Sequence, residues 1–372
     1  MFLAPDFACY HILILILRSN IFSMRFFTFR PAVADAITPK MVVKNVFRPS
    51  KGFGIAIALV ANLYLLTSVQ GQTTYTWNQT GTASWATAAN WAPNRTTPAA
   101  TDILVFNNGA TTTPTSIPTQ TIGQLLVSGN TTVNLQAAAA NTLTIGGGAG
   151  TDLSVASGSQ LNINGTNALA LSLSTGATGS ITGNMTFTIA AHRLTAVDAS
   201  AITFQSGSTS TAGAGFGGNP FGTTGLNSIV FASGSIFAQI AGANPFGASA
   251  PNSVVVFQTG SLFKLNGSIG PSFSGRTYAN FEYNAGATQS VNGGSALSID
   301  NLTVTSGTFN IGMTGTFNLK GNISVASGAT LSFNPSSTAT VTFNGTSNQS
   351  VTNAGTLTFL SNQSVAIANS NT

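Results

Sequence analysis

Charged side chains are scarce in this chain of 372 residues, with 12 Lys and Arg and 7 Asp and Glu, about 5% of the total. An ordinary soluble domain has roughly 25%. This scarcity leaves few groups for acid–base catalysis and rules out extensive surface ion-pair networks. Solvated disorder is also excluded, because apolar residues make up 43% of the chain whereas disordered segments combine low hydrophobicity with high net charge. The chain therefore folds, with little contribution from charge.

The net charge of +5 does not indicate a nucleic-acid partner. Residues 1–51 contain seven of the basic residues and two of the acidic ones, which accounts for the whole excess. From Gln72 onward, five basic residues balance five acidic ones. That part of the chain has no basic footprint for phosphate groups, so we expect no nucleic acid to bind.

Residues 41–71 have the pattern of a secretory signal peptide: a basic start, an apolar run over residues 52–66 and a small-residue exit. The apolar run is about 15 residues long and contains Asn62, whereas a membrane-spanning helix needs about 20 apolar residues. We therefore predict an N-terminal signal helix, export from the cell, and contact with a membrane only through this signal. Residues 1–40 are interpreted as an upstream extension, with Met41 as the natural start.

Cysteine is almost absent, since the only one is Cys9 in the predicted extension. The exported chain would have neither disulfides nor thiolate chemistry. It would also have a single histidine, His192, which argues against a zinc site on composition. We expect no cofactor and no metal. About 300 exported residues are enough to bury a stable core without disulfides.

Apolar residues alternate with Ser, Thr and Asn in short runs from residue 121 onward, as in Leu161 and Ile163 or Val341 and Phe343. This period of two predicts strands with one buried face, and so an all-β protein. A Ser/Thr-Gly turn follows many of these runs at intervals near 25 residues or twice that. These turns contain Gly129, Gly158, Gly207, Gly234, Gly260, Gly307 and Gly328.

Two segments repeat most clearly: 219–237 and 244–263, which both begin with Asn-Pro-Phe-Gly, a type I turn sequence. A repeat of this length indicates a solenoid, in which each coil pairs its backbone with the next coil about 4.8 Å away. We predict a right-handed parallel β-helix over residues 121–372, with the two segments stacked. If they paired as antiparallel hairpins, a β-sandwich would be favoured.

Residues 72–120 contain all three tryptophans, Trp77, Trp85 and Trp91. A solenoid must cover its first coil, and bulky aromatic residues do so. We therefore predict an aromatic N-terminal cap. The alternative is a platform on which sugar rings stack.

The three tryptophans, followed by Pro93, Arg95 and loose Ser-Gly and Asn-Gly β-coils, resemble the passenger regions of secreted bacterial repeat proteins. These are autotransporter-type passengers and similar surface proteins exported with a C-terminal sorting domain. The resemblance implies a non-enzymatic protein, secreted or on the bacterial cell surface, adhesive or structural, with a glycan or a surface protein as partner. The sequence departs from the family in having neither a translocator barrel nor a recognisable sorting domain.

A β-helical polysaccharide lyase or hydrolase is the main alternative, and it requires paired carboxylates or a base beside Arg or Lys. His192 lies next to Arg193 and six residues before Asp198, which allows a base and its orienting group. We instead expect these residues to form a solvated polar turn, and assign no catalytic residues. An ice-binding solenoid is a lesser alternative, because the Thr-x-Thr runs do not recur at a fixed coil position.

Residues 147–152 resemble the start of a calcium-binding nonapeptide, but the motif occurs once, so we expect no metal there.

A weak ligand-binding site is predicted on the strand that begins at Arg276. Alternation places Arg276, Tyr278, Asn280 and Glu282 on its outer side, where an amphipathic ring and polar neighbours suit a sugar or peptide. The alternative is a solvated strand face with an Arg–Glu pair.

At its C-terminus the chain continues the strand alternation to Val365 and Ile367, without charge, proline or a bulky lid. We expect the chain to be part of a longer protein, and its last coil to self-associate end to end.

Overall fold

The computed structural model describes residues 11–18, 21–28, 71–333, 339–360 and 363–371. The chain divides into two compact units, residues 1–70 and 71–372. In the first unit, β1 (His11–Arg18) pairs antiparallel with β2 (Ile21–Thr28). The signal helix expected over residues 41–71 lies outside the described residues, except for Gly71. Among the residues described, no helix has the length and apolar character needed to span a membrane.

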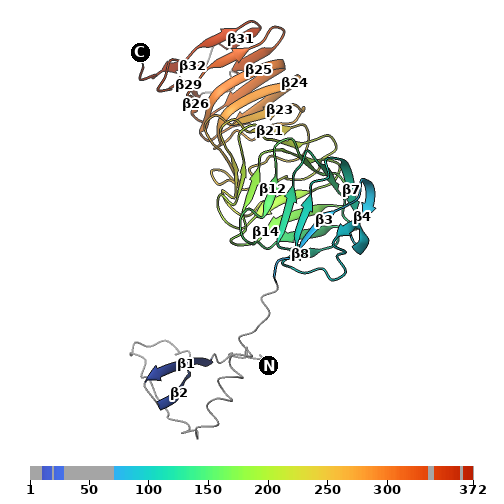
Figure 1. Cartoon of the computed structure of the whole chain (residues 1–372). Coiled ribbons are helices and arrows are strands. Elements are labelled where there is room, and N and C mark those ends of the chain that lie inside the picture. The colour runs from blue at the N-terminus through green and yellow to red at the C-terminus, as the bar shows by residue number, and fades with distance from the viewer. Residues whose placement is uncertain (1–10, 19–20, 29–70, 334–338, 361–362, 372) are drawn as a thin grey trace, which may run out of the picture. The chain divides into compact units, whose positions relative to one another are not determined.

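The second unit is a β-solenoid of about 11 turns, built from parallel strands, as the sequence predicts. Figure 1 shows its strands stacked from β3 and β4 at one end to β31 and β32 at the other. Through most of the stack each coil contributes one strand to each of two faces, and four coils contribute to a third.

The first face contains β3 (Thr74–Trp77), β6 (Ile103–Phe106), β9 (Gln124–Val127), β12 (Leu153–Val155), β15 (Gly179–Ile181), β18 (Ile202–Phe204), β20 (Ile229–Phe231) and β22 (Val255–Phe257). The second face contains β4 (Gly81–Ser84), β7 (Thr111–Thr115), β10 (Thr132–Leu135), β13 (Gln160–Ile163), β16 (Asn184–Phe187), β19 (Thr209–Ala212), β21 (Ile236–Gln239) and β23 (Leu262–Leu265). The third face contains β8 (Gln120–Ile122), β11 (Asn141–Ile145), β14 (Leu169–Leu173) and β17 (Arg193–Ala196).

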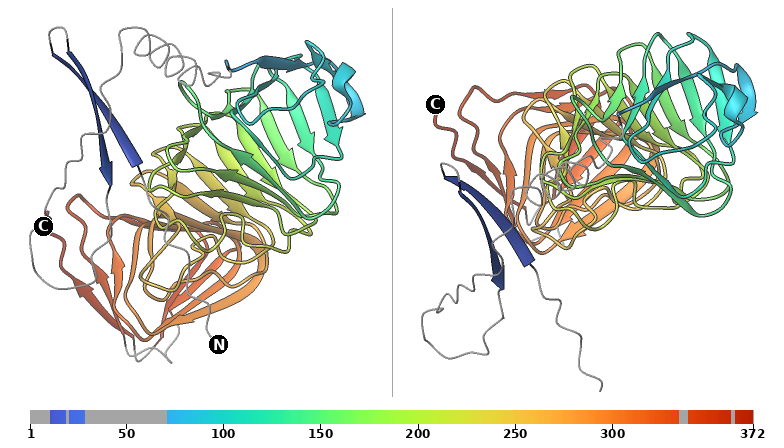
Figure 2. Two further views of the ribbon diagram at one scale, coloured as in Figure 1. Left: turned by 90° about the horizontal axis from the view of Figure 1, so that it is seen from below. Right: turned by 60° about the horizontal axis from the view of Figure 1, so that its bottom comes forward.

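The C-terminal coils contain longer strands. β24 (Thr277–Gly293) and β25 (Leu297–Met313) have 17 residues each and pair with each other along most of their length. β25 pairs in turn with β26 (Phe317–Leu319), β27 (Ile323–Val325) and β28 (Thr330–Phe333). The last strands are β29 (Thr340–Phe343), β30 (Val351–Asn353), β31 (Thr356–Phe359) and β32 (Ser364–Ile367). Figure 2 shows these coils continuing the stack in two further views.

The core lies inside the coils, where the inward side chains of successive strands stack. Phe204, Phe231 and Phe257 are register partners on neighbouring coils. The ring centroids of the first two are 4.5 Å apart, and those of the last two are 5.1 Å apart. Apolar alternation thus produces continuous columns of buried side chains, as expected for strands with one buried face.

Every glycine of the predicted Ser/Thr-Gly turns has a positive φ, between 64° at Gly129 and 88° at Gly260. Glycine adopts this conformation without the steric cost of a Cβ atom. The turns therefore form as the sequence predicts.

The two Asn-Pro-Phe-Gly segments are stacked in parallel, which confirms their predicted relation and excludes the antiparallel alternative. Phe237 pairs with Phe263, and the Asn219 side chain donates a hydrogen bond of 2.8 Å to the backbone oxygen of Asn244.

The parallel coils begin before residue 121, because β3 pairs with β6, and β6 pairs with β9. The segment predicted as a separate cap thus contains the first coils of the solenoid.

Candidate functional site

The three tryptophans form a buried cluster on the first coils. Each is at most 2% exposed. Trp91 lies edge-on to both others, at centroid distances of 4.8 Å from Trp77 and 5.1 Å from Trp85, and all three contact Phe106. Beside this cluster, β5 (Trp91–Ala92) follows the 3₁₀ turn Ala88–Asn90 and pairs antiparallel with β3 at the edge of the first face. The ring faces are not accessible, so the sugar-stacking alternative is wrong, and the cluster covers the first coils.

A buried ion pair holds the loop over this cluster. Arg95 Nε lies 2.7 Å from Asp102 Oδ2, and both side chains are 2% exposed. The same carboxylate oxygen accepts a hydrogen bond of 2.9 Å from the backbone N–H of Ala99. Since the partners neutralise each other away from solvent, this pair joins parts of the cap rather than presenting a reactive group.

The predicted outward orientation of Tyr278 is wrong. Tyr278 and Ala279 are both buried, so the alternation shifts by one residue at this point of β24. The Tyr278 ring packs edge-on against Phe246 and Phe263, and its hydroxyl donates a hydrogen bond of 2.7 Å to the backbone oxygen of Ser272. Burial raises the pKa of Tyr278 well above its usual range.

Arg276 is also buried, at 5% exposure, against the expectation that it faces outward. Its guanidinium lies 4.5 Å from the ring centroid of Phe246. It donates hydrogen bonds to the backbone oxygens of Asn252, at 2.5 Å, and Ala248, at 2.6 Å. Burial lowers the pKa of Arg276. Arg276 fastens the preceding loop and lines a recess of about 420 Å³ with Thr277 and Asn318, whereas the Tyr278 ring is fully enclosed and not presented to a ligand.

Asn280 and Glu282 do lie on the outer side of β24, half-buried. Glu282 pairs with Lys264 on the preceding coil, with Nζ and Oε1 3.0 Å apart, rather than with Arg276. Thr305 on the following coil donates a hydrogen bond of 2.8 Å to the same oxygen. The structure thus separates the four predicted residues into a buried pair and an outer pair.

His192 is fully buried, so the expectation that it is solvated is wrong, whereas Arg193 beside it is exposed as expected. Its Nδ1 accepts a hydrogen bond of 3.0 Å from the backbone N–H of Leu169, and Nε2 lies 3.0 Å from the backbone oxygen of Gly165. Burial lowers the pKa of His192. Asp198 accepts instead from the backbone N–H of Gly176, at 2.6 Å. A His192–Asp198 pair does not form between these described side chains.

Asp152, in the nonapeptide-like motif, connects neighbouring coils. Its Oδ2 accepts a hydrogen bond of 2.8 Å from the backbone N–H of Thr178, and its Oδ1 accepts one of 3.2 Å from Gln124. No group of three or more potential metal-ligating side chains occurs within the described ranges.

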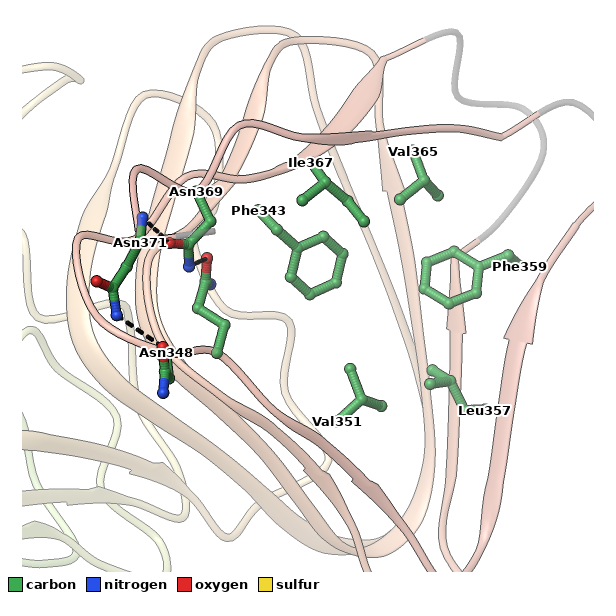
Figure 3. A pocket seen from close by; sticks show the side chains of 10 residues that line it. Phe343, Asn348, Val351, Leu357, Phe359, Val365, Ile367, Asn369 and Asn371 are labelled. Carbon is green, nitrogen blue, oxygen red and sulfur yellow. Dashed lines mark hydrogen bonds between the residues drawn. The ribbon is translucent and has the colours of Figure 1, made fainter.

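A recess of about 430 Å³ opens on the last coils, and we call it the terminal recess. As Figure 3 shows, apolar side chains line one part of it and asparagines the other. The apolar residues are Phe343, Val351, Leu357, Phe359, Val365 and Ile367. At the polar side, Asn371 donates a hydrogen bond of 2.6 Å to Asn348. The Ile367 residue is 76% exposed. Its strand, β32, has one described pairing, which is with β29.

Comparison of the chain with protein-family models, curated proteins and solved structures found no match.

Proposed function

We propose that the chain is a non-enzymatic protein of the cell surface or extracellular space, with an adhesive or structural role. The observation that supports this proposal is the use made of four titratable side chains, although Asp300 is not among them. His192, Asp152, Asp198 and Glu282 each bind a group on a neighbouring coil. Groups tied into the stack in this way are not available as paired acids and bases.

Export is supported by the signal-like segment 41–71. The resemblance to autotransporter-type passengers supports display on the bacterial surface, and repeated coils provide an extended surface for contact with a glycan or protein partner.

Two measurements test this proposal. Antibody labelling of intact cells that express the full chain is expected to detect it at the surface or in the medium. The purified protein is expected to release no reducing or unsaturated ends from a panel of plant, bacterial and animal polysaccharides. Retention inside the cell would contradict export, and polysaccharide cleavage abolished by substituting Asp300 or Asp198 would favour the lyase or hydrolase.

Ice binding remains a lesser alternative, favoured by one feature of the second face. Both β7 and β19 have a Thr-x-Thr pair on their outward side. The strands between them pair in parallel register, so the two pairs lie in line along the second face. The intervening pairs contain Asn or Gln, however, and these amides bind one another, as when Asn162 donates a hydrogen bond of 2.8 Å to Asn134. Thermal hysteresis of the purified protein discriminates this alternative.

The terminal recess supports self-association as a further property of the proposed surface protein. The described pairings of β30, β31 and β32 each lie with one earlier strand, and exposed apolar side chains beside such edges favour pairing with another chain.

A further inference from the structure

A groove of about 590 Å³ crosses successive C-terminal coils of the solenoid, and we call it the axial groove. Its walls include Asn280, Asp300, Asn301, Lys320 and Asn344. These residues come from neighbouring coils, since Asn280 pairs with Asn301 and the N–H of Gly321 donates a hydrogen bond of 2.6 Å to the backbone oxygen of Asp300. The groove therefore extends along the stack and is of a size typical for ligand sites.

Glycines line the groove where neighbouring coils approach closely. Gly260, Gly321 and Gly345 lie along it. A Cβ atom at Gly321 would collide with the Asn301 amide, and one at Gly345 would collide with the backbone oxygen of Lys320. Neighbouring coils can approach closely at these positions only because the glycine side chain is missing.

The groove contains polar groups that the described residues leave unpaired. The Asp300 carboxylate has no hydrogen bond and no ion-pair partner within 4.0 Å among the described residues, although burial raises its pKa and Lys320 opposes that rise. Asn280 Oδ1 accepts a hydrogen bond of 2.7 Å from Asn301, while the amide nitrogen of Asn280 makes none within the described chain. The Oδ1 of Asn344 also lacks a partner among the described residues, but it is buried rather than open to the groove.

We propose that the axial groove binds a neutral oligosaccharide, which deepens the adhesive role and rests on that proposed function. A carboxylate, an ammonium group and carboxamides supply both acceptors and donors, which is what neighbouring sugar hydroxyls require. Asp300 and Lys320 cancel in charge, so the groove favours neither a polyanion nor a cationic peptide. A groove that crosses coils spaced about 4.8 Å apart suits a linear chain of rings.

Isothermal titration of the full chain with cellohexaose, xylohexaose, mannohexaose, maltohexaose and hexagalacturonate tests this proposal. Saturable binding of at least one neutral hexasaccharide is expected, with hexagalacturonate binding more weakly. Asp300→Asn and Lys320→Gln are each expected to weaken that binding about tenfold or more, because hydrogen bonds to charged groups are the stronger ones.

Arg193→Gln is the matched control, since Arg193 is an exposed cation on β17, in the third face. It is expected to leave binding unchanged. Thermal unfolding of Asp300→Asn is expected at or above that of the wild type, because burial disfavours the charged form of this carboxylate. A weaker-binding variant that is fully folded therefore reports on the groove rather than on stability.

Failure of all four neutral hexasaccharides to bind would overturn the proposal, as would equal affinity of the wild type and Asp300→Asn, or preference for hexagalacturonate. A protein that labels at the cell surface but binds no neutral hexasaccharide would remove the groove proposal alone. Cellular retention or polysaccharide cleavage would instead remove the proposed function.

Discussion

His192 is a titratable residue that connects neighbouring coils of the solenoid. It binds the backbone of Leu169 and Gly165 through its two ring nitrogens, and neither neighbour is close to it in sequence. Burial disfavours its charged form, so the neutral ring, with Nδ1 as acceptor, is the form that fits.

This arrangement predicts a loss of stability as the pH falls. The pKa of His192 is lowered in the folded protein from its ordinary value of 6.5, so below about pH 6.5 the unfolded chain binds a proton that the folded chain excludes. The free energy of unfolding should fall, by at most about 1.4 kcal/mol per pH unit. Thermal unfolding between pH 7.5 and 5.5 measures this effect. His192→Gln should be less stable at pH 7.5 but less dependent on pH, and equal pH slopes for the two proteins would refute the account.

Residue orientations were only partly predictable from the sequence. Simple alternation assumes a straight strand, and it is wrong at Tyr278 because two consecutive residues of β24, Tyr278 and Ala279, are buried there. The partners of Arg276 and His192 lie about one coil earlier in the sequence. Only the register between coils reveals such contacts.

At the scale of elements, the Ser/Thr-Gly turns were the most predictable feature, because the requirement for a positive φ is local. Stacking of the Asn-Pro-Phe-Gly segments was also predictable from their repetition. The third face was less predictable from the sequence. It ends at β17 (Arg193–Ala196), after which the described chain adds no strand to it. The bends of β24 and β25 (Leu297–Met313) depend on packing between coils and have no local signal.

The turn geometry predicts unequal effects of two Gly-to-Ala substitutions. Gly328 has a φ of 78° and open space where a Cβ atom would lie, while Gly217 also has open space but no positive φ. Gly328→Ala should cost about 1 kcal/mol through backbone strain alone, and Gly217→Ala should be neutral or slightly stabilising. Urea unfolding of both variants measures the difference. Equal stability of the two variants would show that the turn conformation is not strained by a side chain.

For the whole molecule, the periodic sequence made the solenoid predictable, since repetition near 25 residues leaves few other folds. The axial groove was not predictable, because it depends on which residues of successive coils align. Asp300 and Lys320 come together only through the register of β25 and the turn after β26 (Phe317–Leu319).

The terminal recess predicts self-association. Val365 and Ile367 are 46% and 76% exposed, and sedimentation velocity of the full chain should show a size that increases with concentration. The double variant Val365→Lys and Ile367→Lys should remain monomeric, because charge at a strand edge opposes pairing. Val197→Lys, at a residue 58% exposed outside the recess, is the control and should still associate. A wild-type chain that stays monomeric at high concentration would contradict this prediction.

The parallel stacking of coils underlies the contacts between coils described above, and cysteine cross-linking tests it most directly. Ala238 and Lys264 are register partners on adjacent coils, whereas Glu282 pairs with Lys264 one coil further on. In a Cys9→Ser background, Ala238→Cys with Lys264→Cys should form a disulfide on mild oxidation, because adjacent parallel strands lie about 4.8 Å apart. Ala238→Cys with Glu282→Cys should not, since two coils separate them by about 10 Å. Cross-linking of the second pair, or failure of the first in a folded protein, would contradict the solenoid.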